Sequence, residues 1–405
     1  MACQYSRRDM LRQVSALGVA LAAPTSHAMA SFSSRAALTT APSSPVAIQR
    51  CPSYDRPLLM ARLRRSLDLI GGVGELVKGK TVAIKLNLTG GPQWKLGGLP
   101  AARTYHVHPD FVAATCAAIS EAGAKRIVLL ESGYAEARLE KVMSDAGWDI
   151  DGINAAGNGT VSWEDTRNQG SWPNYSRLKI PWGGYVYGAF DVNAWYEKAE
   201  VLVSLAKMKD HANAGVTLSI KNQFGIAPTS IYGDHLDRAG RPTVKEETIT
   251  ARGSTFHKGE RQPPAGAPQE LDPDSPREWS YRVPRITADL FGARPADLCL
   301  IDGIETNRGG EGPWIKGVQP LQPHLLLAGR NGVCTDAVAT TAMGYDPTAD
   351  HKGFPFMGDN HLALLADKGV GTHDIRQIDV RGLPLKDALF PFNPKRLTVG
   401  EPIFG

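Results

Sequence analysis

The chain contains 405 residues with a formal net charge of +4 at pH 7, and 42% of its residues are hydrophobic. A charge this small gives no reason to expect a nucleic acid as partner, and no segment is long and apolar enough for a stable membrane span. None of the five cysteines lies in a CxxC pair or a ferredoxin-type run, so the sequence has no iron–sulfur cluster motif.

Residues 1–30 have the features of an export signal. The run SRRDMLR at 6–12 resembles the twin-arginine motif, the apolar residues 14–23 follow it, and an A-x-A cleavage site ends at Ala30. We therefore expect recognition by the twin-arginine translocase, cleavage after Ala30 and a periplasmic or otherwise extracytoplasmic protein. Residues 31–45 are rich in Ser, Thr, Ala and Pro, which predicts a flexible tether.

Residues 46–405 alternate strand-like and helix-like segments and make up the predicted folded domain. The predicted strands are 46–49, 81–86, 126–130, 201–205, 298–301 and 325–328, and the predicted helices are 58–70, 109–122, 138–146, 286–291, 333–343 and 361–368. This succession predicts an α/β fold with mixed, largely parallel sheets and helices on both faces. Because a chain of this length exceeds what one core usually holds, we expect sub-lobes at 46–198 and 199–405 around a cleft.

Two parts of this domain lack a regular pattern. Residues 151–198 lose helical periodicity and are dominated by Trp, Tyr, Gly and Asn, so we expect irregular structure and short antiparallel strands there. Residues 229–284 are polar and Pro-rich, which predicts a long loop. Loops of this length are uncommon in compact domains unless they have a function, and this one is placed to cover a pocket.

The segment 200–235 carries the clearest chemical signal. Its buried strand is followed by Lys207, Lys209 and His211, whose spacing of two places them on one face of an extended chain. Lys221-Asn222 and His235 come next. Ligands of open α/β sheets bind beyond the carboxyl ends of strands, so these residues form a candidate active site. The alternative is a solvated loop, but packing alone does not account for the clustering of the positive charges.

Polar residues also follow other predicted strands. Lys85 and Asn87 end the strand before Gly90-Gly91, and Asp302 ends the strand before a glycine-rich loop at 308–313 that contains Glu311. That loop matches neither the Walker nor the dinucleotide fingerprint, so it is a weak signal for anion binding.

Two residues near predicted helix starts have alternative roles. His108 precedes Pro109 at a helix N-terminus, where it would stay neutral and suit proton transfer, or would merely cap the helix or face solvent. Asp336 lies in the first turn of its helix, where its negative charge would complement the positive end of the helix dipole.

These motifs together resemble the family known as domain of unknown function 362. The matching pieces are IKLN at 84–87, HPDF at 108–111, LAKMKDH with TLSIKNQFG across 205–225, IDGIETNRGGEGP at 301–313 and the DAVATTAMGYDP run at 336–347. The K-x-K-x-H followed by K-N-x-x-G is the most specific element. Many relatives carry ferredoxin-like motifs beside this domain, and this chain lacks them.

A more distant resemblance is to the lactate racemase family, on the order and spacing of His211, Lys221 and His235. The resemblance implies that His211 and His108 are acid/base residues, that Lys221 either anchors a nickel pincer nucleotide or contacts the substrate, and that His235 binds the metal. The Lys-Asn pair of this chain departs from that family's pattern.

We therefore expect an exported enzyme that acts on a small anionic carboxylate or phosphate by proton or hydride transfer, with racemase, isomerase or oxidoreductase chemistry. His211, Lys221 and His108 are the predicted catalytic residues, and a divalent transition metal would be held by His235 with Asp302 or Glu311. The alternative is a periplasmic anion-binding protein without catalysis. The predicted substrate-binding residues are Lys207, Lys209, Lys85, Asn87 and Asn222.

Overall fold

A computed structural model describes residues 41–132, 138–167, 174–234, 252–351 and 353–393. Contacts divide the chain into two units, Met1–Thr39 and Thr40–Gly405, and the described residues all belong to the second unit. The predicted signal at 1–30 and most of the predicted tether lie outside the described residues. Across the described ranges, no helix has the length and hydropathy that a membrane span requires.

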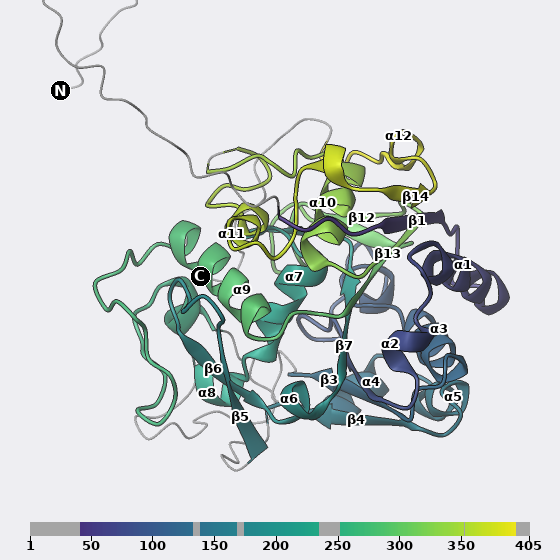
Figure 1. The fold of residues 1–405 in the computed structure, drawn as a ribbon, viewed down its shortest axis with the longest axis horizontal. Helices are drawn as coiled ribbons and strands as arrows, with labels where there is room; N and C mark the ends of the chain where they lie inside the picture. The colour runs from purple at the N-terminus through teal and green to yellow at the C-terminus, as the bar shows by residue number, and fades with distance from the viewer. Residues whose placement is uncertain (1–40, 133–137, 168–173, 235–251, 352, 394–405) are drawn as a thin grey trace, which may run out of the picture. The chain divides into compact units, whose positions relative to one another are not determined.

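An eight-stranded sheet forms the centre of the second unit (Figure 1). Its order is β14-β1-β13-β10-β7-β2-β3-β4, and of these eight described strands only β13 runs antiparallel to its neighbours. The α/β fold with a largely parallel sheet is therefore confirmed. The strands are β1 (Val46–Arg50), β2 (Thr81–Lys85), β3 (Arg126–Glu131), β4 (Val161–Asp165), β7 (Val201–Lys207), β10 (Leu298–Gly303), β13 (Leu325–Gly329) and β14 (Val380–Gly382).

Strand β10 shows why both faces of the sheet are covered. All six of its residues are buried, and the first four alternate between two apolar cores. Leu298 and Leu300 belong to the core on one face, while Cys299 and Ile301 belong to the core on the other. A strand that is buried on both faces needs consecutive apolar residues, and this continuous apolar run is the signal from which the strand was predicted.

The helices divide between these two faces (Figure 1). One face packs against α1 (Arg56–Leu69), α2 (Gly74–Val77), α3 (Pro109–Glu121), α4 (Leu139–Asp145) and α5 (Ile150–Ala156). The other packs against α7 (Leu218–Asn222), α9 (Trp279–Ala293), α10 (Gly332–Ala342), α11 (His361–Asp367) and α12 (Leu385–Ala388). The shorter helices α6 (Trp195–Lys198) and α8 (Thr229–Tyr232) complete the described set.

Three two-stranded ladders lie outside the main sheet: β5 (Tyr175–Lys179) with β6 (Ala189–Asn193), β8 (Asp210–His211) with β9 (Gly215–Val216), and β11 (Thr306–Arg308) with β12 (Gln319–Leu321). The β5–β6 ladder is the antiparallel structure expected within 151–198. The sequence prediction missed α5, whose start is capped by the Asp149 side chain, and β4, which adds a parallel strand to the edge of the sheet.

The predicted helix at 286–291 begins earlier than expected, at Trp279, and contains Pro284. A proline inside a helix leaves one carbonyl of the preceding turn without its usual donor. Here the carbonyl of Ser280 accepts a hydrogen bond from the backbone N of Asp359 at 3.1 Å. That replacement donor comes from a distant segment, so the sequence around Pro284 could not indicate it.

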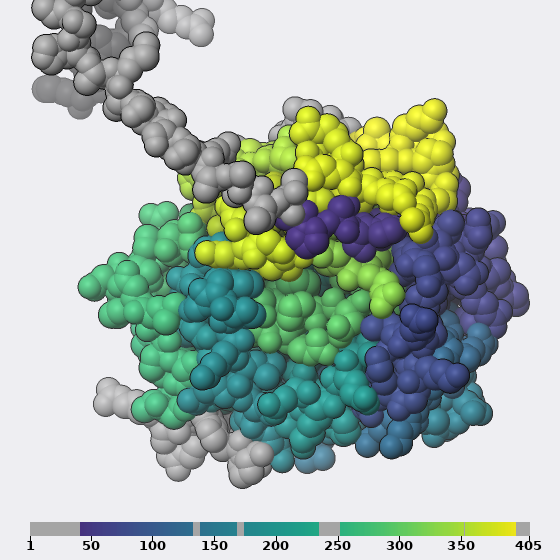
Figure 2. All heavy atoms as spheres, in the orientation of Figure 1, coloured from purple at the N-terminus to yellow at the C-terminus, as the bar shows by residue number. Residues whose placement is uncertain are grey.

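The chain changes direction in the sheet at β2. From β2 it moves to β3 and β4 on one side, and it then returns to β7 on the other side of β2 and continues to β10. Strands from both sides of residue 198 are thus joined in one sheet. At its far edge β1 pairs with β14, which brings the start and end of the described chain together (Figure 2). A reversal of strand order such as that at β2 leaves a crevice beyond the strand ends, where ligands of open sheets bind.

Candidate functional site

A cavity of about 470 Å³ opens at this crevice. Its size lies within the range of small-molecule sites. The wall is built from the loop after β2, the end of β3, the β8–β9 ladder, α7, a short π-helical turn at Gly253–His257 and the loop after β11. The charged and polar residues on this wall include Lys85, Asn87, Glu131, His211, Asn213, Lys221, Asn222, Arg252, His257 and Glu311.

Lys221 is the most unusual of these residues because, among the described residues, its ammonium has no carboxylate or hydrogen-bond partner. Its side chain is buried, with 7% of the residue exposed, and the ammonium lies 3.8 Å from the centre of the Phe224 ring. In the part of the chain that the structure describes, no oxygen accepts a hydrogen bond from this ammonium. Burial lowers the pKa of Lys221 from its ordinary value of 10.5 to about 7, and the Glu311 carboxylate opposes the shift only in part.

The helix α7, which carries Lys221, is a single turn held from outside. Leu218 begins it with a φ of +45°, and the side chain of Thr217 provides no cap. The Asp336 carboxylate instead accepts the backbone N–H groups of Ser219 and Ile220, at 2.9 and 2.7 Å. Asp336 therefore caps a different helix from its own, as the sequence could not indicate, and burial raises its pKa to about 7.

Two histidines on the wall are fixed by one residue, Asn213. The backbone N of Asn213 donates to Nδ1 of His211 at 3.2 Å, and its side-chain Nδ2 donates to Nδ1 of His257 at 3.0 Å. The backbone and side-chain nitrogens of Asn213 carry hydrogen and cannot accept a hydrogen bond. Each Nδ1 is therefore the acceptor, and each neutral ring carries its proton on Nε2. Burial lowers the pKa of His257 to about 3 and that of His211 well below its usual range, so both are neutral.

Lys85 differs from Lys221 because it is paired. Its ammonium lies 2.7 Å from Oε1 of Glu131 and donates to the carbonyl of Leu86 at 2.6 Å. Asn222 lies beside it, with Oδ1 3.4 Å from the Lys85 ammonium. The structure thus brings together, at one cavity, the predicted residues Lys85, Asn87, His211, Lys221, Asn222 and Glu311.

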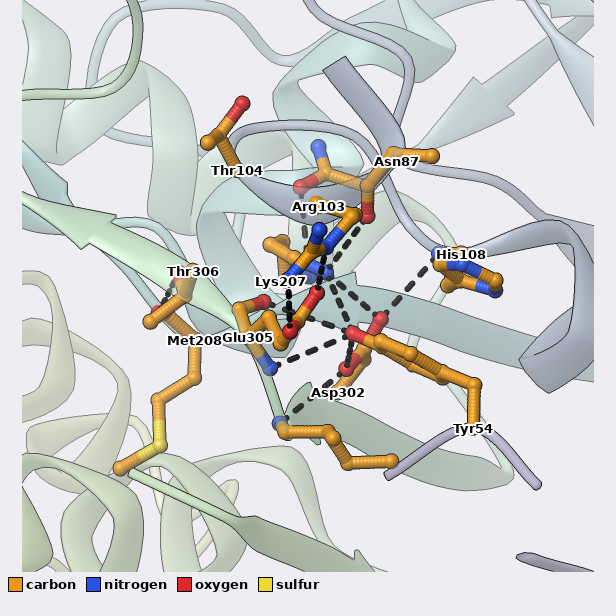
Figure 3. A network of polar contacts seen from close by, with 12 residues as sticks. Tyr54, Asn87, Arg103, Thr104, His108, Lys207, Met208, Asp302, Glu305 and Thr306 are labelled. Carbon is orange, nitrogen blue, oxygen red and sulfur yellow. Dashed lines mark hydrogen bonds and ion pairs between the residues drawn. The ribbon is translucent and has the colours of Figure 1, made fainter. Parts of the chain in front are cut away.

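Lys207 and Asp302 belong to a separate network of polar contacts (Figure 3). The Lys207 ammonium is fully buried and donates to Oδ2 of Asp302 at 2.8 Å and to the hydroxyl of Tyr54 at 3.0 Å. It also donates to the carbonyl of Ala102 at 3.2 Å. Neither Lys207 nor Asp302 lines the cavity. The structure does not place Lys207 where it can bind a substrate there, since its donors are used within the protein.

His108 and Lys209 also lie away from the cavity wall. The His108 ring stacks on Tyr54 with centroids 3.7 Å apart, and its Nδ1 accepts the backbone N–H of Asp110. This is the capping role, one of the alternatives that the sequence left open, and burial lowers the pKa of His108 to about 4. Lys209 is fully buried and donates to the carbonyl of Tyr105 at 2.6 Å, while burial lowers its pKa to about 7.

The predicted metal ligands do not form a common site among the described residues. His235 lies outside them, Asp302 is held in the network around Lys207, and Glu311 accepts hydrogen bonds from Ala212 N and Trp314 Nε1. Within the described ranges, no group of three His, Cys, Asp or Glu side chains is arranged to hold a metal ion. Lys221 presents its amine to the cavity, where a covalently held group would attach, while the predicted metal ligand His235 lies outside the described residues.

Sequence analysis missed Arg252 and His257, which lie in the segment predicted as a loop. Arg252 donates to the carbonyl of Ala227 and to Oγ of Ser132, both at 2.7 Å, which fixes the turn that carries His257. No periodicity or motif marks this turn, and its partners are distant in the sequence. The only signal was the length of the segment, which suggested a cover for a pocket.

Comparison with known proteins places these features in a family. A thylakoid-associated protein of Synechocystis sp. is 29% identical over 303 residues, which is 75% of each chain. The solved lactate racemase apoprotein of Thermoanaerobacterium thermosaccharolyticum matches 69% of this chain at 14% identity, with a TM-score of 0.34, and this chain spans 54% of that protein. The family model for the domain of unknown function DUF362 matches residues 82–341. This match covers more than half of the chain, and the chain belongs to that family, as its motifs predicted.

Proposed function

We propose that this protein is an enzyme that binds a small anionic metabolite in the cavity and moves a proton on it, with Lys221 as the acid/base residue. The observation that carries the proposal is the buried, unpaired ammonium of Lys221, whose pKa lies at about 7. An acid/base group is most effective when its pKa is close to the working pH. A buried amine without a partner costs stability, so a role in chemistry accounts for its position better than packing does.

The surroundings of Lys221 suit an anion. Arg252 and the charged form of Lys221 supply positive charge, and His211 and His257 present Nε2–H donors without adding charge. Neutral imidazoles can donate to an oxygen on which negative charge develops, while remaining too weakly basic to take up the proton themselves. Glu131 is paired with Lys85, and Glu311 accepts hydrogen bonds from Ala212 and Trp314, so Lys221 is the wall residue best suited to carry the proton near neutral pH.

The chemical step that follows is proton transfer beside a carbonyl or carboxylate. The neutral amine of Lys221 takes the proton from carbon, the electron pair of the broken C–H bond moves to the oxygen, and the histidine N–H groups stabilise that oxygen. Returning the proton to either face of the carbon gives racemase-type or isomerase-type chemistry. Atoms and charge balance within the ligand and Lys221.

The test is proton exchange in deuterated water. Small 2-hydroxy, 2-amino and 2-oxo acids would be incubated with the purified chain, and NMR would follow loss of the proton on carbon 2 of the hydroxy and amino acids and on carbon 3 of the oxo acids. We expect exchange in the wild type and a loss of at least about 100-fold in Lys221→Met, the range of a general base. Lys316→Met, at an exposed lysine, is the matched control and should exchange like the wild type.

The second candidate is an anion-binding protein without catalysis. The fixed Nε2–H donors of His211 and His257 favour it, because they suit a held anion as well as a developing one. Under this alternative, Lys221→Met weakens binding of the acid, and no member of the series exchanges its proton in the wild type. Binding without exchange would therefore overturn the enzymatic proposal and support the binder.

We also propose that the protein is exported in folded form by the twin-arginine translocase. The supporting observation is the ordered succession of the twin-arginine pair, the apolar run and the A-x-A site in residues 1–30. Arg7→Lys combined with Arg8→Lys should leave the chain uncleaved inside the cell, and intact mass of the wild type should show cleavage after Ala30. A wild-type chain that keeps its first 30 residues would contradict the proposal.

A further inference from the structure

The two carboxylates on the cavity wall have different partners. Oε1 of Glu131 lies 2.7 Å from the ammonium of Lys85, and both side chains are almost fully buried. Glu311 accepts hydrogen bonds from two neutral groups: Oε2 from the backbone N–H of Ala212 at 2.9 Å, and Oε1 from the indole N–H of Trp314 at 3.1 Å. Among the described residues, no lysine or arginine forms an ion pair with Glu311. The partners of Glu311 leave its charge in place, whereas Lys85 neutralises that of Glu131.

His211 lies beside Glu311 but does not neutralise it. Its Nδ1 is 3.7 Å from Oε2 of Glu311, and this Nδ1 accepts the backbone N–H of Asn213. Burial lowers the pKa of His211 well below its usual range, so the ring is neutral. A carboxylate has room for about four hydrogen bonds, and the described residues supply two. Glu311 therefore presents to the cavity a negative charge that can accept further donors, and a positively charged group of a ligand suits it.

The loop that carries Glu311 is held by contacts within the protein. The backbone N–H of Gly309 donates to Oδ2 of Asp210 at 2.6 Å, and Nδ2 of Asn307 donates to the carbonyl of Gly310 at 2.5 Å. These contacts fix the two residues that directly precede Glu311. A carboxylate held in advance loses little conformational entropy when a ligand binds, so it is suited to recognition. The glycine-rich loop, a weak sequence signal for anion binding, thus presents a carboxylate to the cavity.

We infer that the ligand is a 2-amino acid whose ammonium binds Glu311 and whose carboxylate accepts the Nε2–H groups of His211 and His257. This inference rests on the proposed function and narrows its substrate class, with the carboxylate as the anionic group. The ammonium is on the carbon next to the carboxylate, so its two sites must be close together, and Glu311 and His211 lie side by side on the wall. A 2-oxo group has no hydrogen to donate to Glu311, and a 2-hydroxyl donates without a positive charge.

This placement uses different wall residues for binding and for proton transfer. Neither the carboxylate nor the ammonium is bound to the amine of Lys221, which can take the proton from carbon 2 as in the proposed function. The C–H bond breaks, an N–H bond forms on Lys221, and the electron pair moves into the carboxylate held by the histidines. The ammonium stays on Glu311 and withdraws electrons from carbon 2, which favours loss of the proton. Return of the proton from Lys221 to carbon 2 completes the cycle, so atoms and charge balance.

Two matched sets of probes test the inference by calorimetric titration of the purified chain at pH 7. One set is alanine, lactate and pyruvate, and the other is phenylalanine, phenyllactate and phenylpyruvate. Within each set only the group on carbon 2 changes. In the set that binds more tightly, we expect the amino acid to bind at least about tenfold better than its hydroxy and oxo partners, because an ionic hydrogen bond replaces a neutral or missing one.

Glu311→Gln keeps the size of the side chain and removes its charge. It should weaken binding of the amino acid at least about tenfold and change the affinity of the hydroxy acid less than about threefold. The hydroxy acid thus reports whether the cavity of the variant is intact. Glu197→Gln, at an exposed carboxylate that does not line the cavity, is the matched control and should bind all probes like the wild type.

The outcomes separate this inference from the proposed function. If the hydroxy or oxo acid binds as tightly as its amino acid, or if Glu311→Gln weakens the amino and hydroxy acids equally, the inference is overturned. The proposed function stands in that case if the bound acid exchanges its proton in deuterated water and Lys221→Met loses the exchange. If the amino acid binds through Glu311 but exchanges no proton, the ligand class stands and the proposed function falls. If no probe binds at millimolar concentration, both fall.

Discussion

Lys207 and Lys221 lie fourteen residues apart, and the protein uses them in opposite ways. Lys207 is fully buried, and its ammonium has a carboxylate, a hydroxyl and a carbonyl as partners. Lys221 is nearly as buried, but its ammonium faces a cavity and lies over a phenyl ring. A buried charge with a complete set of partners holds structure together, and one without partners is available to a ligand. The difference lies in the partners and not in burial.

The largest expected effect is the loss of the Lys207 pair. Lys207→Met leaves the Asp302 carboxylate buried without its counter-charge, so the free energy of unfolding should fall by about 3–5 kcal/mol. Denaturant unfolding followed by circular dichroism measures this change. Combining it with Asp302→Asn should recover part of the loss, since the uncompensated charge is then removed. Equal stability of the Lys207→Met single variant and wild type would show that the pair contributes nothing.

Lys221→Met should change the free energy of unfolding in the opposite direction, towards greater stability. The folded pKa of Lys221, about 7, lies below its ordinary value of 10.5, so its burial costs stability at neutral pH. That cost is absent above about pH 10.5 and grows as the pH falls towards 7. Removing the amine should therefore raise the free energy of unfolding by about 1–3 kcal/mol at pH 7 while it weakens carboxylate binding. A variant less stable than wild type at pH 7 would contradict the contrast with Lys207.

The pH dependence of binding sharpens the comparison. The positive charge of Lys221 attracts a carboxylate to the cavity, whereas proton abstraction uses its neutral amine, so carboxylate affinity should fall about three- to tenfold as the pH rises from about 6 to about 8 through the folded pKa. Lys209 has a similar pKa, so the control must isolate Lys221. Lys221→Arg keeps its charge over this range and should bind with a nearly flat pH profile. If its profile falls as steeply as that of wild type, another group controls binding.

The smallest expected effect concerns Asn213. Asn213→Ala removes the donor to Nδ1 of His257 but keeps the backbone N–H that bonds His211, so only His257 should lose its fixed tautomer. Carboxylate binding should weaken by about 1 kcal/mol, the contribution of one hydrogen bond. Nitrogen-15 NMR of the imidazoles reports the change directly. The signals of His108, whose Nδ1 accepts the backbone N–H of Asp110, serve as the internal reference, and an unchanged His257 spectrum would refute the assignment.

Much of the fold was accessible from the sequence because its signals are local. The strands at 201–205 and 298–301 were recognised from continuous apolar runs, and both lie within central strands of the sheet. The lysines of the candidate site were likewise predicted to lie just beyond the end of a strand. Features that depend on distant partners were missed: the helix predicted at 286–291 was found, but not its start at Trp279, where Asp359 from another segment supplies the donor that Pro284 lacks.

The site was predictable only in part, for the same reason. The sequence placed Lys207 and Lys221 in one cluster but contained no local sign of which one is paired. The partners of Lys207 are Asp302, 95 residues later, and Tyr54, 153 residues earlier. His257 was missed because Asn213, which orients it, lies 44 residues away. Pairing across such separations is fixed by tertiary packing, and no spacing rule encodes it.

The capping of α7 by Asp336 has a consequence for the order in which the protein assembles. The amides of Ser219 and Ile220 meet their acceptor 117 and 116 residues further along the chain. Closing so long a loop is entropically costly and slow, so local contacts of the sheet can form before this one. The turn that carries Lys221 is therefore expected to be among the last parts to become ordered during folding, and a nascent chain that ends before α10 lacks the residue that orients it.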